Sequence, residues 1–302
     1  MGSSLIDEVT EDQIAAWAQA AQAATAQGQV NQRIAALAHC SPDWFGLEIH
    51  LQKRRHFVWG ITQHPFALMS VVKPFLLLYL LELYGTDQVF QWVGGMPSDA
   101  PFNDLNQLKA DGGHPRNPMI NSGALVLADH LPGTAPAADF CRWLNQLANC
   151  RLSLDSVMLK AVKTGRRDAN LALLNYLAET GQIRHPETAI DSYERLCCLS
   201  GRLQDLARIG ELLALKGPVA GAHRQAVNAL MLTCGLYEAS PDYAMKVGLP
   251  MKSGISGALL TTLPKRGVIV TYGPALNAQG NSVAGLAFVA RMAQALNLSL
   301  FA

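Results

Sequence analysis

Alternating and helical hydrophobic patterns divide the chain into strand-rich ends and a helical middle. Near the start, residues 45–51 (FGLEIHL) alternate between apolar and polar side chains as in a half-buried strand, and residues 56–59 have the composition of a hairpin partner. After Gly248 the alternation returns in MKSGISGALLTTLP and GVIVTYGP, and the apolar run that follows ends as a helix. The sequence therefore predicts strands from both ends of the chain.

The middle of the chain has the period of helices. Between about residues 117 and 235, apolar side chains recur at spacings of three and four, with Gly and Pro at the breaks. One antiparallel sheet assembled from both ends, with a helical cluster inserted between them, explains this order. We therefore predict an α+β (α/β/α-like) fold and a single domain over residues 1–302, with a mixed α/β part at 1–75 and 245–302 and a mainly helical part at about 76–244.

One serine and one lysine interrupt the apolar run FALMSVVKPFLL at residues 66–77. Pro74 is tolerated only in the first turn of a helix, so the helix is expected to begin near Ser70 and to place Ser70 and Lys73 on one face. A lysine at this spacing can take the proton of a serine hydroxyl if burial lowers its pKa. The tetrapeptide is common, and two polar residues at a helix start would also explain it.

A second element suited to acyl transfer is Met-Lys-Ser-Gly at residues 251–254. S-x-x-K followed by a K-T-G strand is the combination found in β-lactamases and penicillin-binding proteins. Such a strand could bring a second cation and backbone N–H groups to face the serine and form an oxyanion hole. The alternative is a surface lysine at Lys252 and a β-bulge at Gly254.

Longer segments of the chain resemble the serine-dependent glutaminases of the β-lactamase-like superfamily. These segments are PFNDLNQL (101–108), PRNPMINSGAL (115–125), CGLY (234–237), VGLPMKSGISG (247–257) and YGPALNAQGNSVAG (272–285). They span most of the chain in the order of the family. The resemblance implies a β-lactamase-like or transpeptidase-like fold, hydrolysis of a side-chain amide through an acyl-enzyme, L-glutamine as the expected substrate, and a homodimer or homotetramer.

The resemblance also implies a role for individual residues. Ser70 would be the nucleophile and Lys73 its general base. Tyr237 would relay the proton to the leaving ammonia, and the backbone N–H of Ile255 would join that of Ser70 in the oxyanion hole. Three further residues fall where the family binds the amino-acid end of its substrate: Asn121, Asn170 and Tyr193. Helix capping by the asparagines and a core position for the tyrosine are the alternatives.

The chain departs from the family pattern at three recognition sites. Arg33 and Ala35 stand where the family has a tyrosine and a proline, and Met69 replaces the glutamine before the nucleophile. The glutamate that holds the α-ammonium of the substrate is replaced by Val162 or Lys163. An ammonium without a carboxylate in a desolvated site costs several kcal/mol, whereas Arg33 and Lys163 would suit an anionic or N-blocked group.

These departures leave several hypotheses open. The chain could be an amidohydrolase for an N-blocked or anionic glutamine-like amide, or a binding protein without turnover. Retention of the chemical residues argues against the binding protein. Glu238, next to Tyr237, could replace the missing acid and preserve glutamine as the substrate. A β-lactamase proper would need a glutamate-activated water, and no acid lies at an obvious place for it.

Composition and charge exclude several classes of function. The chain has 302 residues, of which 50% are hydrophobic and 16% charged, and a net charge of +1. A nucleic-acid-binding surface needs many clustered cations, whereas only two short basic runs occur, at 53–55, where we expect a hairpin turn, and at 166–167. The most apolar window, residues 66–84, contains Lys73 and Glu82, so no membrane span is expected.

No cofactor or metal ion is expected from motifs. The sequence has no phosphate-binding glycine loop, no dinucleotide fingerprint and no H-E-x-x-H pair, and its six cysteines show neither CxxC nor Cys/His metal spacing. Residues 5–14 are acidic, unlike a signal peptide, and the cysteines fit a reducing compartment. We therefore expect a cytoplasmic protein whose partner is a small-molecule amide.

Overall fold

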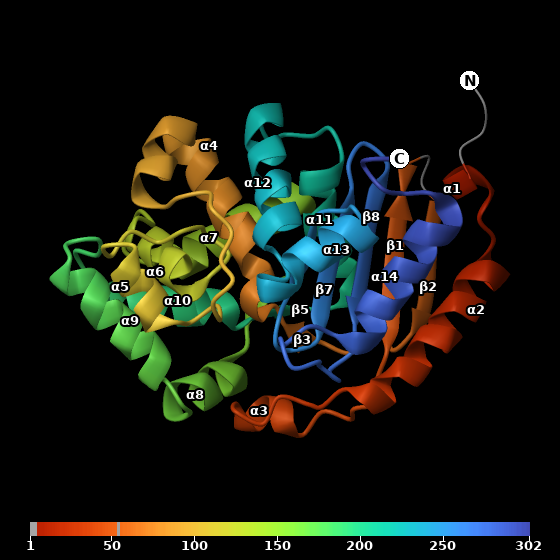
Figure 1. Cartoon of the computed structure of the whole chain (residues 1–302), viewed down its shortest axis with the longest axis horizontal. Coiled ribbons are helices and arrows are strands. Elements are labelled where there is room, and N and C mark those ends of the chain that lie inside the picture. Colours follow the sequence, from red (N-terminus) through yellow and green to blue (C-terminus); the bar gives the residue numbers. More distant parts are fainter. Residues whose placement is uncertain (1–4, 53–54) are drawn as a thin grey trace.

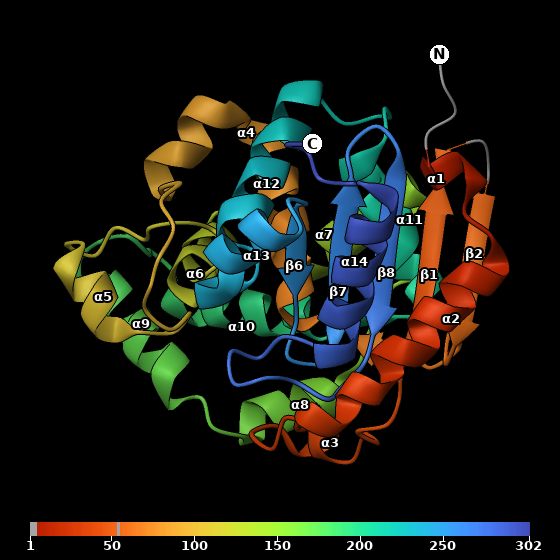
Figure 2. The same cartoon turned by 45° about the vertical axis from the view of Figure 1, so that its right-hand side comes forward.

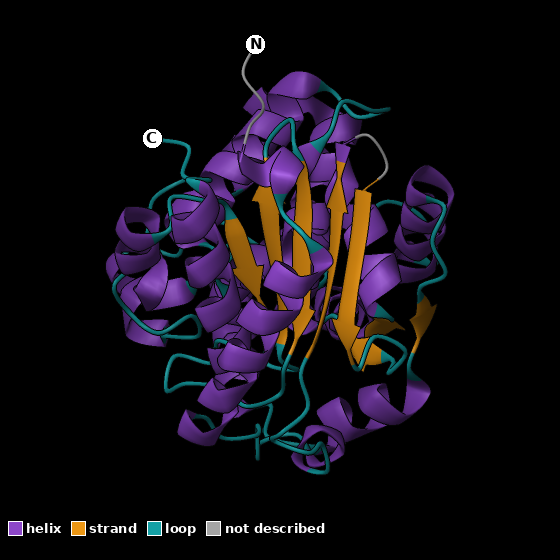
Figure 3. Ribbon diagram, turned by 90° about the vertical axis from the view of Figure 1, so that its right-hand side faces the viewer, coloured by secondary structure: helices purple, strands orange, loops and turns teal. Residues whose placement is uncertain are grey.

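The computed structural model describes residues 5–52 and 55–302, so Lys53 and Arg54 of the predicted hairpin turn lie outside it. Its centre is a five-stranded antiparallel sheet in the order β2-β1-β8-β7-β6 (Figures 1, 2 and 3; all five strands are labelled in Figure 2). Its strands are β1 (Gly46–Leu51), β2 (Arg55–Gly60), β6 (Met251–Ser253), β7 (Ala258–Leu263) and β8 (Gly267–Tyr272). The prediction of an antiparallel sheet built from both ends of the chain is confirmed.

Successive side chains of β1 point to opposite faces of the sheet. Leu47 and Ile49 join a core cluster with apolar side chains of α2 (Glu11–Gln22) and α14 (Val283–Leu296), and these two helices cover that face (Figure 2). Glu48 and His50 lie on the other face, which α11 (Leu203–Ala214) covers. β1 is buried on both faces, so its polar side chains Glu48 and His50 lie in the interior of the protein.

The helical cluster lies beside the sheet around α4 (Lys73–Trp92) (Figure 1). Together with the turn before it, this helix is long and apolar enough to cross a membrane, but 72% of its most apolar window is buried inside the protein. Helices α6 and α12 pack against it. The other helices of the cluster are α5 (Leu105–Ala110), α6 (Asn121–Asp129), α7 (Pro136–Ala148), α8 (Ser156–Thr164), α9 (Asp168–Glu179), α10 (Pro186–Cys197), α12 (Gly221–Cys234) and α13 (Ser240–Lys246).

A small second sheet contributes the strand that precedes α4 in the chain. Its strands, in the order β3-β5-β4, are β3 (Phe66–Ala67), β5 (Leu199–Gly201) and β4 (Ser153–Leu154). β3 is followed by a 3₁₀ turn at Met69–Val72 and then by α4, with Pro74 in the first turn of the helix as predicted. The boundaries proposed between the mixed and the helical part of the chain stay a prediction.

Candidate active site

Ser70 lies in the 3₁₀ turn between β3 and α4 and is buried. The residue before it, Met69, has φ = 47°, in the left-handed region that non-glycine residues rarely adopt. Such a conformation costs on the order of 1–3 kcal/mol and often occurs at functional sites. The chain therefore turns sharply from strand to helix directly at the predicted nucleophile.

Lys73 follows one helical turn later and is completely buried. Its Nζ donates to the carbonyl oxygen of Met119 at 3.0 Å and to Oδ1 of Asn121 at 2.7 Å. Burial lowers the pKa of Lys73 to about 7, against a smaller opposing effect of the Cys197 sulfur. A substantial fraction of this amine is therefore neutral near pH 7 and can accept a proton.

The segment PRNPMINSGA positions both partners of Lys73. The buried Asn117 side chain accepts from the N–H groups of Met119 and Ile120 at 2.9 and 3.3 Å, which fixes the turn before α6. A Cβ at Gly123 would lie 2.1 Å from the Asn117 carbonyl oxygen, so only glycine fits there. This close packing places Asn121 as the first residue of α6.

Asn121 joins three helices at the predicted substrate end of the site. Its Nδ2 donates to Asn170 Oδ1 of α9 at 2.8 Å, and the hydroxyl of Tyr193 in α10 donates to its Oδ1 at 3.1 Å. Burial raises the pKa of Tyr193 well above its ordinary value, so this hydroxyl remains a donor. The structure therefore brings Lys73, Asn121, Asn170 and Tyr193 into one hydrogen-bonded cluster.

Tyr237 and Lys252 border Ser70 from the sheet side. The Tyr237 hydroxyl donates to the Ser253 carbonyl oxygen at 3.4 Å, and burial raises the pKa of Tyr237 to about 12, although a hydrogen bond with Ser70 favours the phenolate. Lys252 Nζ lies 4.2 Å from the centre of the Tyr237 ring and donates to the Ser253 carbonyl oxygen at 2.8 Å. Lys252 is completely buried, so the alternative of a surface lysine is wrong.

The end of β6 packs against the turn that carries Ser70. A Cβ at Gly254 would lie 2.7 Å from the Leu68 carbonyl oxygen and 3.4 Å from Met69 Cβ, so the two backbones meet here. Ile255 follows in the turn between β6 and β7, which the bond from Gly257 N–H to the Gly254 carbonyl oxygen closes at 2.9 Å. Ile255 thus directly follows the residue that packs against the turn carrying Ser70.

The residues that depart from the family pattern lie outside this hydrogen-bonded cluster. Arg33 is exposed, and its carbonyl oxygen lies near Gly165, between α8 and α9. The Lys163 ammonium forms an ion pair with Asp191 of α10, so its charge is partly compensated. Asp191 lines a cavity of about 700 Å³ between α7 and α10, and neither Ser70 nor Lys73 lines that cavity.

Two features of the site were missed by the sequence-based prediction. Cys197 is buried beside Tyr193 and Lys73, and burial raises the pKa of its thiol to about 11. Its i, i+4 spacing from Tyr193 on one helix was the sequence signal that could have placed it at the site. Glu194, 2% exposed, forms a bidentate pair with Arg167 at 2.6 and 3.0 Å. No local pattern indicates this pair, because its members lie 27 residues apart.

The sheet with its helical cluster defines the chain as a β-lactamase-like α+β protein. The family model Glutaminase matches residues 28–301. The glutaminase of Synechocystis sp. is 40% identical over 95% of this chain and 89% of its own length, and that of Methylobacterium radiotolerans is 35% identical over 91% and 93%. This chain belongs to the glutaminase family.

Solved structures agree with this assignment. The probable glutaminase ybaS is 28% identical with a TM-score of 0.87, covering 94% of this chain and 98% of its own. A probable glutaminase from Bacillus subtilis, complexed with 6-diazo-5-oxo-L-norleucine, is 27% identical with a TM-score of 0.87, covering 97% of each chain. The predictions of a β-lactamase-like fold and of a glutaminase-type hydrolase are confirmed.

Proposed function

We propose that this protein hydrolyses the side-chain amide of L-glutamine to L-glutamate and ammonia, with Ser70 as the nucleophile. The observation that carries the mechanism is the buried amine of Lys73, one turn after Ser70, with its pKa near 7. The names of the relatives support the substrate, and another similar solved structure is described in its glutamate form.

In the acylation step, the Ser70 hydroxyl attacks the amide carbonyl carbon and its proton passes to neutral Lys73. The negative oxygen of the tetrahedral intermediate accepts hydrogen bonds from the backbone N–H groups of Ser70 and Ile255. Removal of one such donor typically lowers kcat 10²–10³-fold. The C–N bond then breaks as Tyr237 gives its phenolic proton to the leaving nitrogen and regains a proton from protonated Lys73. Ammonia departs, Ser70 is left acylated, and Lys73 is neutral again.

In the deacylation step, water attacks the ester on Ser70. Neutral Lys73 takes a proton from this water, the second tetrahedral intermediate collapses, and Lys73 returns that proton to the Ser70 oxygen as it leaves. The net reaction consumes one water and releases one carboxylate, and both steps use the same base and oxyanion hole.

The amino-acid end of glutamine would bind at the cluster of Asn121, Asn170 and Tyr193. Glu238 is the candidate partner of the α-ammonium, because its Oε2 is enclosed and has no hydrogen-bond partner among the described residues. An enclosed carboxylate oxygen without a donor is costly, and an ammonium group would supply the donor. The ion pair of Lys163 with Asp191 lessens the repulsion that Lys163 would otherwise exert on this ammonium.

A second candidate is an amidohydrolase for an N-blocked or anionic glutamine-like amide. Val162 and Lys163, at the place of the family glutamate, and the exposed Arg33 favour it. It differs from the first proposal only in the amino-acid end of the substrate, since the reacting groups are the same.

Ammonia release from L-glutamine and from N-acetyl-L-glutamine by the purified protein separates the two candidates. We expect turnover of L-glutamine that Ser70→Ala abolishes, and a higher KM with little change in kcat for Glu238→Gln. Turnover of the N-acetyl compound alone would establish the second candidate instead. Equal turnover by Ser70→Ala would refute the serine mechanism for both.

The remaining expectations concern assembly and location. We propose a homodimer or homotetramer in the cytoplasm, on the resemblance to the family. Light scattering on the purified protein measures its oligomeric state, and fractionation of the source cells tests its location. A monomer at micromolar concentration would contradict the proposed assembly.

A further inference from the structure

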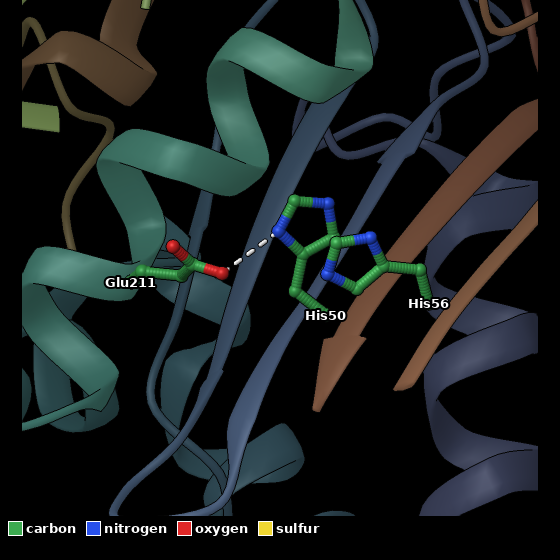
Figure 4. Close-up of side chains that lie close together, drawn as sticks. All are labelled: His50, His56 and Glu211. Carbon is green, nitrogen blue, oxygen red and sulfur yellow. Dashed lines mark hydrogen bonds and ion pairs between the residues drawn. The ribbon is translucent and has the colours of Figure 1, made fainter. Parts of the chain in front are cut away.

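Four polar side chains meet on the face of the sheet that α11 covers. They come from three elements: Glu48 and His50 from β1, His56 from β2 and Glu211 from α11 (Figure 4 shows the last three). His50 and His56 are direct partners in the register of β1 and β2. We call these four residues the His50 cluster. None of them takes part in the mechanism proposed above.

Both ring nitrogens of His50 contact a carboxylate. Nε2 lies 2.7 Å from Oε1 of Glu48, and Nδ1 lies 2.8 Å from Oε1 of Glu211. Glu48 and His50 are buried, with 5% and 3% of their surfaces exposed, whereas Glu211 is half-buried and His56 is exposed. The cluster therefore has a buried side, at Glu48, and a side open to solvent.

We propose that the His50 cluster binds one divalent transition-metal ion of the Zn²⁺ class through His50, His56 and Glu211. Two imidazole nitrogens and one carboxylate oxygen are ligands typical of zinc, with a fourth position left for water. The candidate ligand atoms of the three residues lie within 4.8 Å of one another. This proposal does not depend on the proposed glutaminase activity.

Glu48 provides the orienting contact that metal-binding histidines usually have. Such a histidine donates its second ring N–H to a carboxylate, which fixes the tautomer and the ring orientation. The bond between His50 Nε2 and the buried Glu48 carboxylate would keep a proton on Nε2 when an ion displaces the proton of Nδ1, so that the Nδ1 lone pair is directed at the ion. The structure thus contains a carboxylate–histidine pair before any ion is bound.

Charge favours a divalent ion over the proton now shared at this position. Two carboxylates against one protonated His50 leave the cluster with a net charge of about −1, whereas two carboxylates, two neutral histidines and one divalent cation sum to zero. The ion would replace the proton between His50 Nδ1 and Glu211. Binding is therefore expected to release a proton.

Only a small movement is needed to complete the coordination. Ligands at about 2.0–2.1 Å from one tetrahedral zinc lie roughly 3.3 Å apart. The rings of His50 and His56 are stacked, with centroids 4.1 Å apart and planes 8° from parallel, so the His56 ring must turn to direct a nitrogen at the ion. Because His56 is exposed, its side chain can rotate without displacing the core.

The cluster and the candidate active site lie at opposite edges of the sheet. β2 is one edge strand and β6, which carries Lys252, is the other; β8 and β7 lie between β1 and β6. A bound ion would join β1 and β2 to α11, so we expect it to raise the melting temperature of the protein. We expect little change in the rate of glutamine hydrolysis.

Isothermal titration of the full-length, EDTA-dialysed protein with Zn²⁺ near pH 7.5 tests the proposal. We expect saturation at one ion per chain and a rise in melting temperature with Zn²⁺ concentration. His56→Gln should weaken Zn²⁺ binding at least tenfold, and Glu48→Gln about 10–100-fold. His39→Gln, a change at another exposed histidine, is the matched control and should leave the affinity unchanged.

Two results would overturn the proposal. One is the absence of saturable binding at millimolar Zn²⁺ by folded wild-type protein. The other is wild-type affinity in both His56→Gln and Glu211→Gln, which would place the ion elsewhere, for instance at the cysteines. Melting curves of the apo variants show whether they fold, and because His56 is exposed its variant should melt close to wild type.

Discussion

Replacing Lys73 by methionine is expected to abolish turnover and to stabilise the fold near neutral pH. Lys73 is completely buried, and burial lowers its pKa from 10.5 to about 7. Each tenfold change in an equilibrium constant corresponds to about 1.4 kcal/mol, so charging Lys73 costs the folded protein roughly 5 kcal/mol. Methionine has a similar length and no charge, so the variant is free of this cost.

The loss of two hydrogen bonds reduces the net gain. Lys73 Nζ donates to the Met119 carbonyl oxygen at 3.0 Å and to Asn121 Oδ1 at 2.7 Å. A buried acceptor left without a donor costs about 1–3 kcal/mol. Asn121 retains the Tyr193 hydroxyl as a donor at 3.1 Å, so its cost falls at the low end. We expect a net gain of about 1–3 kcal/mol below pH 7.

The sign of the pH dependence follows from the two pKa values of Lys73. The unfolded chain holds the lysine proton up to about pH 10.5 and the folded protein only up to about pH 7. Between these values the unfolded state binds more protons, so the stability of the wild type rises with pH. Relative to Lys73→Met, the wild type should gain about 2.5 kcal/mol as the pH rises from 7.5 to 9.5, and the stability difference between the two proteins should level off below about pH 7.

Urea unfolding at about pH 6, 7.5 and 9.5 measures this difference, and ammonia release measures turnover. Ser70→Ala is the control, because it removes the nucleophile and retains the buried lysine. We expect Ser70→Ala to follow the pH dependence of the wild type. A stability difference between wild type and Lys73→Met that is the same at all three pH values would refute the argument from burial of Lys73.

Three further predictions concern the same site. The value of kcat/KM for glutamine should rise with pH through about 7 as Lys73 loses its proton; a flat profile between about pH 5.5 and 8 would exclude Lys73 as the base. Tyr237→Phe should lower kcat about 10²–10⁴-fold with little change in KM or melting temperature, because it removes only the hydroxyl near Ser70; wild-type kcat would exclude the proton relay. Arg167→Met should cost about 2–3 kcal/mol in urea unfolding, because Glu194, 2% exposed, loses its partner while Arg167 is partly exposed; an unchanged midpoint would show that solvent compensates Glu194.

The strands and the start of the helix that follows Ser70 could be predicted from the sequence, because they depend on local patterns. The alternation in residues 45–51 and the first-turn position of Pro74 are local properties, and they correctly predicted a strand and a helix start. The prediction that this strand is half-buried was wrong, because α11 covers the face on which its polar side chains lie. The roles of Asn121 and Tyr237 came from the resemblance to the family. Their contacts with Lys73 and Ser70 could be described only once the fold had brought distant segments together.

The features that the sequence did not predict depend on contacts between distant segments. Lys252 could equally have been a surface strand residue, because a three-residue strand has too few positions to show alternation. The His50 cluster joins β1 to Glu211, 161 residues away, and histidines without metal-ligand spacing gave no signal in the sequence. Such clusters become visible only when the register of β1 and β2 and the position of α11 are known.

Two of the three departures from the family pattern, at Arg33 and Ala35 and at Val162 or Lys163, fall where the fold tolerates change, whereas the third, Met69, is buried next to Ser70. Ser70, Lys73 and Lys252 are buried, so replacing any of them alters both packing and the charge balance of the interior. Val162 is half-buried and Lys163 is exposed in the C-terminal segment of α8, where a substitution typically changes stability by less than about 0.5 kcal/mol. Substrate recognition can therefore change in this segment while the reacting groups remain the same. For this reason the substrate of this protein is to be sought by varying the amino-acid end of the amide, not the bond that is broken.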